Sequence, residues 1–303
     1  MRITFASPSS KISGTLAVGV PEGGKLGPLA VDLNKASDGA LMRAIEASRF
    51  DGAKNELLEI LAPAGLDSAR LLLIGVGDPA SLSSLEMESI GGSLIARLNS
   101  LGETDASLLI ESFGTNGAQP HQRAARVALG ARLRHYRFDK YKTTEKIEKK
   151  LSMKTLSLLC EKPGEAKKAY ASLAKVAEGV FTSRNVISEP ANVIFPKSFV
   201  EEAQKLEELG VKVSALTEKE MKKLGMNALL AVGEGSEKES RLLVMEWRGA
   251  GPKDSPIALV GKGVCFDSGG ISIKPAAGME DMKWDMGGAG VVLGAMQALA
   301  GRK

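Results

Sequence analysis

Two lysines and two aspartates lie among many glycines in the last fifty residues, in a region that contains no histidine. Lys262, Asp267 and Lys274 fall within the stretch GKGVCFDSGGISIKP, and Asp285 follows shortly afterwards in WDMGGAG. A glycine inside a regular helix or strand costs about 0.5–1 kcal/mol relative to alanine. So many glycines therefore indicate a backbone that must turn tightly or approach another group closely.

The four charged side chains admit two interpretations. In the first, they form two ion pairs that hold the loops together, although such pairs stabilise a buried site less well than apolar packing. In the second, Asp267 and Asp285 supply hard oxygen ligands for Mn²⁺, Mg²⁺ or Zn²⁺. One lysine would then be a ligand as the neutral amine, because a nearby dication lowers its pKa. Lys274 would stay charged and polarise a carbonyl group. The residue types alone leave both interpretations open.

Apolar runs on either side of these residues predict the elements that position them. The run IALV predicts a strand at 257–263, and Lys262 and Asp267 fall where this strand runs out. Ligands of open α/β sheets bind beyond the carboxyl ends of the strands, so this placement is typical of a binding site. The stretch VVLGAMQALA, after Asp285, predicts a helix.

The rest of the chain alternates strand and helix patterns, which predicts an α/β fold with a mixed or parallel sheet and helices on both faces. We expect a first α/β domain at 1–160, a linker helix at 161–185 and a second domain at 186–303. The main predicted strands are 16–20, 27–33, 69–77, 106–112, 156–160, 211–216 and 241–247, and the main predicted helices are 85–102, 165–185, 196–209 and 217–224.

Composition excludes several classes of protein. Hydrophobic residues make up 44% and charged residues 25% of the 303 residues, and no apolar run approaches the length of about 18 that spans a bilayer. The opening residues lack the apolar segment of a signal peptide, so we expect a cytoplasmic protein with Cys160 and Cys265 as free thiols. His121 and His135 lie far from the glycine cluster, which excludes a histidine-based zinc site there. The net charge of +4 is too mild to indicate nucleic-acid binding.

The glycine-rich stretch resembles a motif of the leucyl aminopeptidases, the cytosol aminopeptidases of peptidase family M17. The family pattern G-K-G, then F-D-S-G-G, then S-x-K-P, is met at 261–263, 266–270 and 272–275. The stretches NVISEPANVIFP and GMNALLAVGEGS also look like family segments. The resemblance is strong from about residue 185 onward and weak in the first domain.

The resemblance implies a role for each motif residue. Lys262 would ligate one metal through its neutral amine, Asp267 would contact two metals, and Asp285 would complete the site that Lys262 shares. Lys274 would be the catalytic electrophile at the scissile carbonyl group. Met282 would line the pocket for the first side chain of the substrate, and all five residues would contact that substrate.

The resemblance also implies the overall design. A smaller N-terminal α/β domain would be followed by the start of a larger α/β catalytic domain, with a mixed sheet flanked by helices. The protein would be a homo-hexamer that holds two divalent ions per subunit, Mn²⁺ or Zn²⁺ and possibly Mg²⁺. It would release N-terminal amino acids, with a leucine-type preference, from peptides. Neither a membrane nor a nucleic acid would be its partner.

One part of the family pattern has no counterpart. The remaining metal carboxylates and an active-site arginine belong to an N-T-D-A-E-G-R segment, which is absent from these 303 residues. We therefore expect residues 1–303 alone to have little peptidase activity. The alternatives are an inactive truncated paralogue and a DNA-binding or regulatory protein. A phosphate-binding enzyme is disfavoured because neither G-x-x-x-x-G-K-[ST] nor G-x-G-x-x-G occurs.

Overall fold

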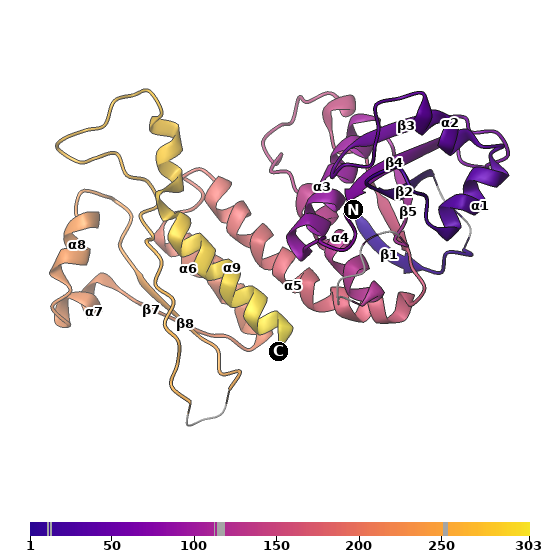
Figure 1. The fold of residues 1–303 in the computed structure, drawn as a ribbon. Coiled ribbons are helices and arrows are strands. Elements are labelled where there is room, and N and C mark those ends of the chain that lie inside the picture. Colours follow the sequence, from indigo (N-terminus) through magenta and orange to yellow (C-terminus); the bar gives the residue numbers. More distant parts are fainter. Residues whose placement is uncertain (11, 13, 112, 114–118, 251–253) are drawn as a thin grey trace. The chain divides into compact units, whose positions relative to one another are not determined.

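The computed structural model describes all residues except 11, 13, 112, 114–118 and 251–253 (Figure 1). The chain divides into two compact units, Met1–Ala174 and Lys175–Lys303. The division falls inside helix α5 (Pro163–Ser188), the helix expected to be a linker. The domain boundaries expected from the sequence stay a prediction. In the described part of the chain, no helix is long and apolar enough to cross a bilayer.

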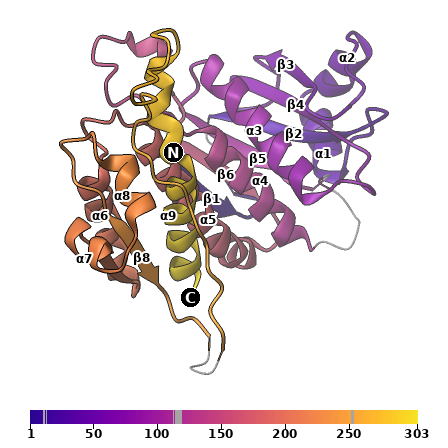
Figure 2. The same ribbon diagram turned by 90° about the vertical axis from the view of Figure 1, so that its left-hand side faces the viewer.

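The first unit is built on a sheet whose described strands run in the order β1-β6-β5-β2-β4-β3 (Figure 2). Neighbours pair in parallel except β3, which is antiparallel to β4 at the edge. The strands are β1 (Arg2–Ala6), β2 (Thr15–Pro21), β3 (Leu57–Leu61), β4 (Arg70–Gly77), β5 (Asp105–Leu109) and β6 (Thr155–Leu159). The predicted α/β class with a mixed sheet is confirmed. Of the strand predicted at 106–112, residue 112 lies outside the described residues.

Both faces of this sheet are covered by helices, which explains why the central strands β2, β4 and β5 are buried along most of their length. Leu16 and Val18 of β2 pack in one core with α1 and α2, while Ala17 between them packs in the opposite core with α3 and α4. A strand buried on both faces reads as a continuous apolar run. The helical elements of this unit, apart from α5, are α1 (Pro28–Ala36), α2 (Ala40–Glu46), α3 (Ser84–Ser100), α4 (Pro120–Arg134) and η1 (Ile147–Lys149).

The strand predicted at 27–33 is wrong, because this segment begins helix α1. Pro28 occupies the first helical turn, where its fixed φ suits a helix and its missing N–H costs nothing. The Glu111 carboxylate then accepts hydrogen bonds from the free amides of Leu29 and Ala30, each at 2.7 Å. This cap comes from a distant part of the sequence, so the local apolar pattern could not reveal it.

The described part of the second unit pairs β7 antiparallel with β8 and surrounds them with helices. Its core includes Val186 of α5, Phe199, Leu206, Met286 and Leu293. The capping box predicted at the start of helix α7, between a threonine and a glutamate, is confirmed. The elements are α6 (Pro196–Gln204), η2 (Lys205–Leu209), β7 (Lys212–Leu216), α7 (Glu218–Lys223), α8 (Asn227–Gly233), β8 (Leu242–Glu246), η3 (Met279–Met286) and α9 (Gly287–Arg302).

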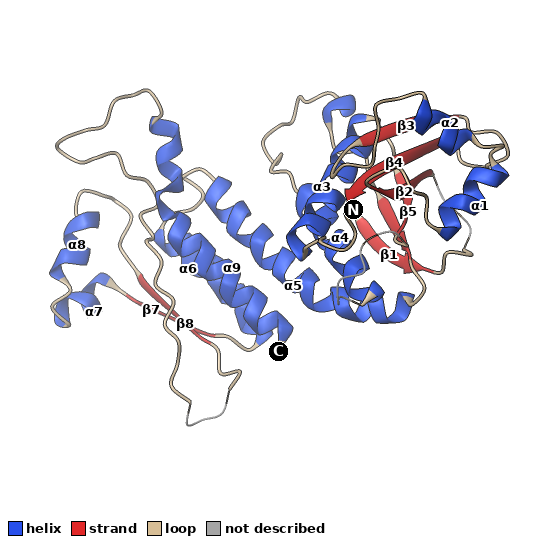
Figure 3. Cartoon of the chain, in the orientation of Figure 1, coloured by secondary structure: helices blue, strands red, loops and turns tan. Residues whose placement is uncertain are grey.

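The strand predicted at 257–263 is also wrong, since this segment is an extended loop (Figure 3). A strand needs a neighbour to accept and donate its backbone hydrogen bonds, and no described strand pairs with this segment. Its apolar side chains are correspondingly open to solvent: Ile257 is 90% exposed and Val260 94%. The apolar pattern is therefore that of a strand, but the pairing is missing.

Helix α9 lies beside the second half of α5, as both views show (Figures 1 and 2). Small residues make this approach possible, because a Cβ added at Gly179 would overlap the carbonyl oxygen of Gly294. A Cβ added at Gly294 would in turn overlap the hydroxyl oxygen of Ser183. That hydroxyl donates a hydrogen bond to the carbonyl oxygen of Gly290 at 2.8 Å. The two helix backbones are therefore in direct contact.

The contact between α3 and α4 provides a matched test of packing in the first unit. A Cβ added at Gly91 would overlap the carbonyl oxygen of Val127, whereas one added at Gly92 would lie 3.6 Å from the Cβ of Arg134. We expect Gly91→Ala to lower the free energy of unfolding by about 1–3 kcal/mol, the range typical of overpacking. Gly92→Ala should leave it unchanged or raise it by up to about 1 kcal/mol. Urea unfolding followed by circular dichroism measures both, and equal effects would contradict this packing.

Candidate functional site

The glycine-rich loop and the turn η3 bring the predicted charged residues together as two ion pairs. Lys262 is paired with Asp285, and the Nζ atom of Lys274 lies 3.2 Å from Oδ2 of Asp267. The side chains are 26–58% exposed, with Asp285 the most covered, so the pairs are accessible from solvent. Lys274 also donates to the sulfur of Met282 at 3.0 Å.

A close backbone contact joins the Lys262 loop to the first turn of α9. The amide of Ala289 donates to the carbonyl oxygen of Lys262 at 2.9 Å. A Cβ added at Gly261 would overlap the carbonyl oxygen of Gly288, and one at Gly288 would lie 2.8 Å from the amide nitrogen of Lys262. Glycine is required on both sides because the main chains themselves touch. This contact places Lys262 beside Asp285, although the two are far apart in sequence.

A second tight turn places Asp267 beside Lys274. The amide of Lys274 donates to the carbonyl oxygen of Ser268 at 2.9 Å, which closes the loop between them. Gly269 and Gly270 have φ values of 99° and 86°, a conformation that other residues rarely adopt. Oδ1 of Asp267 accepts from the Gly269 amide at 2.9 Å, which leaves Oδ2 facing Lys274.

The lysines control the electrostatics of the site. The hydrogen bond from Lys274, the Gly269 amide and the more distant charge of Lys262 hold the pKa of Asp267 below its ordinary value. Both aspartates thus face a cation, and Lys262 acts on each of them. Burial raises the pKa of the neighbouring Cys265 thiol to about 11, so this thiol is protonated at neutral pH and cannot serve as a thiolate nucleophile.

The donor atoms fit part of a divalent metal site. Oδ2 of Asp285 is buried and has no hydrogen-bond partner among the described residues, an arrangement that costs free energy unless a cation or donor satisfies the atom. Carboxylate oxygens and an uncharged amine are suitable ligands for Mn²⁺ or Zn²⁺. In the described parts of the chain, however, no three His, Cys, Asp or Glu side chains are grouped as a metal site.

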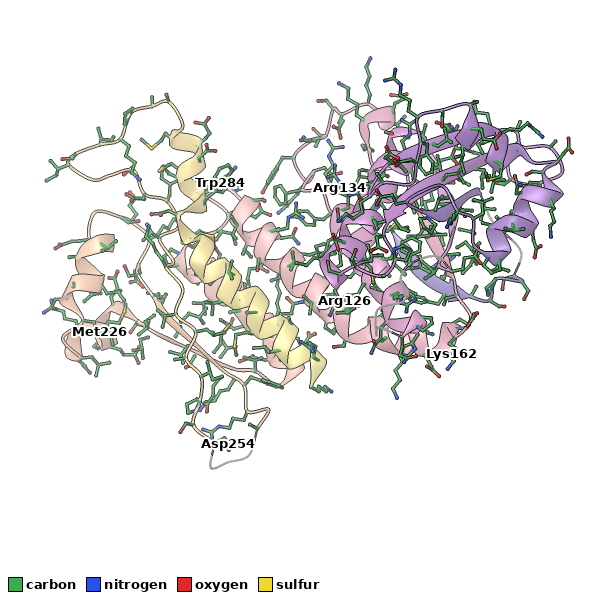
Figure 4. All side chains as sticks on the ribbon, viewed as in Figure 1. Arg126, Arg134, Lys162, Met226, Asp254 and Trp284 are labelled. Atoms are coloured by element: carbon green, nitrogen blue, oxygen red, sulfur yellow. The ribbon has the colours of Figure 1, made fainter. Side chains whose placement is uncertain are left out.

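The structure brings all five sequence-predicted site residues into one region. Lys262 faces Asp285, and Lys274 lies between Asp267 and Met282. The neighbouring Trp284 lies on η3, just before α9 begins (Figure 4). The support that α5 gives to the start of α9 was not predicted from the sequence. The glycines spaced four apart in α9 were the available signal, because such spacing puts small residues on one face of a helix.

Two family descriptions match the chain. Residues 17–145 match the N-terminal domain of the cytosol aminopeptidase family, and residues 181–303 match the catalytic domain of the same family. The second match contains all five site residues. The glycine-rich loop and α9 therefore belong to the part of the chain that matches a catalytic domain.

Individual proteins give a consistent result. A probable cytosol aminopeptidase of Caulobacter vibrioides is 49% identical over the whole of this chain. A solved structure of a mutant tomato leucine aminopeptidase is 26% identical and covers 99% of the chain with a TM-score of 0.81. The bottromycin maturation enzyme BotP in complex with Mn is 25% identical and covers 94% of the chain with a TM-score of 0.70.

The chain spans about 60% of the length of the curated relatives that it matches. It covers 61% of the Caulobacter vibrioides protein, 59% of the tomato enzyme and 56% of BotP. Each of these proteins thus has a further portion with no counterpart in the 303 residues.

The backbone contact at the start of α9 predicts a difference between two nearby glycines. Gly261→Ala should lower the free energy of unfolding of the second unit by about 1–3 kcal/mol, because the new Cβ overlaps the Gly288 carbonyl. Gly263→Ala is the control, since its Cβ would lie 3.4 Å from that of Ala289, an ordinary contact. Urea unfolding followed by tryptophan fluorescence reports on this unit, which contains both tryptophans. Loss of stability in the control alone would contradict the contact.

Proposed function

We propose, because the chain belongs to the cytosol aminopeptidase family, that its glycine-rich site is part of the active centre of a metal-dependent aminopeptidase. The observation that carries this proposal is the joint position of Lys262, Asp267, Lys274 and Asp285. Oδ2 of Asp285 has no hydrogen-bond partner in the part of the chain that the structure describes. The substrates are peptides, from which the enzyme releases N-terminal residues with a leucine-type preference. We further propose that it acts in the cytoplasm.

Three residues would hold divalent metal. Asp285 and Lys262 already meet and would share one ion, while Asp267 would contact that ion and a second one. A bound divalent ion supplies a Lewis acid for the peptide carbonyl and lowers the pKa of water. Lys262 must lose its proton to become a ligand. Metal binding would therefore exchange the Lys262–Asp285 ion pair for two metal–ligand bonds.

Lys274 would keep its charge and act on the substrate. Its ammonium group is held on two sides, by Asp267 and by the sulfur of Met282, and it remains 37% exposed. A preorganised cation of this kind stabilises the negative charge that develops on a carbonyl oxygen under attack. Met282, directly beside it, would contact the apolar side chain of the N-terminal residue. Recognition and polarisation of the substrate would thus take place at adjacent atoms.

The ligand count bears on activity. Two divalent ions need roughly four to six protein ligands, and this chain offers Lys262, Asp267 and Asp285 at the site. The relatives have a further portion, in which we place the remaining ligands by analogy with the family. Manganese is our first choice of metal, because the related BotP was solved with Mn. We also propose that the complete enzyme is a homo-hexamer.

The division of roles predicts that metal binding separates the two kinds of residue. Asp285→Asn should lower the affinity for Mn²⁺ by about 10-fold or more, since it removes a charged ligand. Lys274→Ala should leave that affinity unchanged and lower kcat by about 10²–10³-fold, the usual loss for one oxyanion donor. Calorimetric titration with Mn²⁺ and the hydrolysis of leucine 4-nitroanilide measure the two effects. If Lys274→Ala releases the metal, Lys274 is a ligand and the proposed division is wrong.

The ligand count predicts a weak enzyme. The 303-residue chain should bind fewer than two Mn²⁺ ions tightly and turn over leucine 4-nitroanilide much more slowly than the Caulobacter vibrioides relative, which serves as the positive control. Exhaustive chelation should remove whatever activity Mn²⁺ supports. Activity that survives chelation would overturn the metal-dependent reaction. Two tightly bound ions with the turnover of the longer relative would overturn the ligand account.

A further inference from the structure

We infer that Ser183 and Ile187 on α5 are positioning residues that hold Asp285 against Lys262. They act through the first turn of α9, which both of them contact. The inference deepens the proposed function. Of its two readouts, only metal binding rests on that proposed function. Its second readout is the exchange rate of the Ala289 amide with solvent. The backbone hydrogen bond of this amide forms without any metal.

One row of the α5 residues that face α9 is spaced four apart, and these residues therefore lie on one face of the helix. Each of them meets a glycine of α9, and at Gly290 and Gly294 an added Cβ would have no free space. At Gly290, an added Cβ would lie 2.7 Å from Cγ1 and 2.9 Å from Cδ1 of Ile187. The hydroxyl of Ser183 binds the carbonyl oxygen of the same glycine. The α5 residues in this row are Lys175, Gly179, Ser183 and Ile187.

The first turn of α9 is thus held on two sides. On one side, Gly290 rests on Ser183 and Ile187. On the other side, the preceding Ala289 donates its amide to the carbonyl oxygen of Lys262. Asp285 enters the same helix through η3, which ends where α9 begins. A shift of this turn away from α5 would therefore change the distance between Asp285 and Lys262.

The contacts are direct, so they leave little room for adjustment. Protein interiors are close-packed, so the strain from a single added methyl group is transmitted to the neighbouring backbone. A ligand pair must keep its geometry to within a fraction of an ångström to bind metal well, and supporting residues typically affect metal affinity about 10–100-fold. Ser183 and Ile187 meet these conditions because each contacts the first turn of α9, which directly follows η3, where Asp285 lies.

The test adds a methyl group at Gly290 and then removes the two atoms that it meets most closely. Gly290→Ala should raise the exchange rate of the Ala289 amide with solvent by about 10-fold, because its bond to Lys262 is strained open. Mn²⁺ affinity should fall by about 10-fold in the same variant. The double variant Gly290→Ala/Ile187→Ala removes Cγ1 and Cδ1 of Ile187 and should restore both values at least in part. Ser183→Ala is a milder variant and should change both in the same direction as Gly290→Ala.

One control separates positioning from general loss of stability. Gly301→Ala lies on the same helix but meets only the flexible side chain of Lys175, at 3.2 Å, and should change neither readout. Ile187→Ala alone removes packing beneath the first turn of α9, so it should lower the unfolding temperature and change both readouts in the same direction as Ser183→Ala. Amide exchange is followed by NMR, and metal binding by calorimetry, on the full 303-residue chain.

The outcomes distinguish the two proposals. Unchanged exchange at Ala289 in both Gly290→Ala and Ser183→Ala would overturn the positioning role, even if the wild type binds Mn²⁺. Failure of the double variant to recover either value would overturn the role of Ile187. If the wild type binds no Mn²⁺, the proposed metal site fails, while recovery of the Ala289 exchange rate would still support the positioning role.

Discussion

The arrangement of the site depends on one backbone hydrogen bond, from the amide of Ala289 to the carbonyl oxygen of Lys262. It joins a loop without regular structure to the start of a helix, and the helix rests on α5. Because the contact is made by main chains, it demands glycine at 261 and 288 and places no demand on the neighbouring side chains. The backbone contact therefore does not depend on the lysine and aspartate side chains, which can serve the chemistry of the site. The glycines determine where these side chains meet.

The charges of the site balance in the absence of metal. Each lysine neutralises one aspartate, so the ensemble of Lys262, Asp267, Lys274 and Asp285 carries no net charge at neutral pH. A divalent ion can enter such a site only if a proton leaves or further anions arrive. The loss of a proton from Lys262 would remove one positive charge, but two ions would require more negative charge than these residues hold. The additional negative charge would have to come from residues outside this group of four.

Local signals in the sequence were sufficient for elements that are stabilised by their own residues. The capping box between Thr217 and Glu220 is an example, and so is the buried strand β4, whose apolar run is continuous. Helix α1 was mistaken for a strand because its cap, Glu111, comes from elsewhere in the chain. The segment 257–263 was mistaken for a strand because its pattern does not disclose whether a partner is present.

In the site, too, local features could be predicted from the sequence and distant contacts could not. The motif identified its charged residues, but the pairing of Lys262 with Asp285 depends on a tertiary contact that no local pattern contains.

The glycines of α9 have one more consequence. Gly290 and Gly294 each cost the helix about 1 kcal/mol relative to alanine, so the isolated segment would be a poor helix in water. Docking on α5 must supply the missing stability, which makes the coil-to-helix transition of α9 and the formation of the core one cooperative event. Asp285 consequently acquires its place only when the second unit folds.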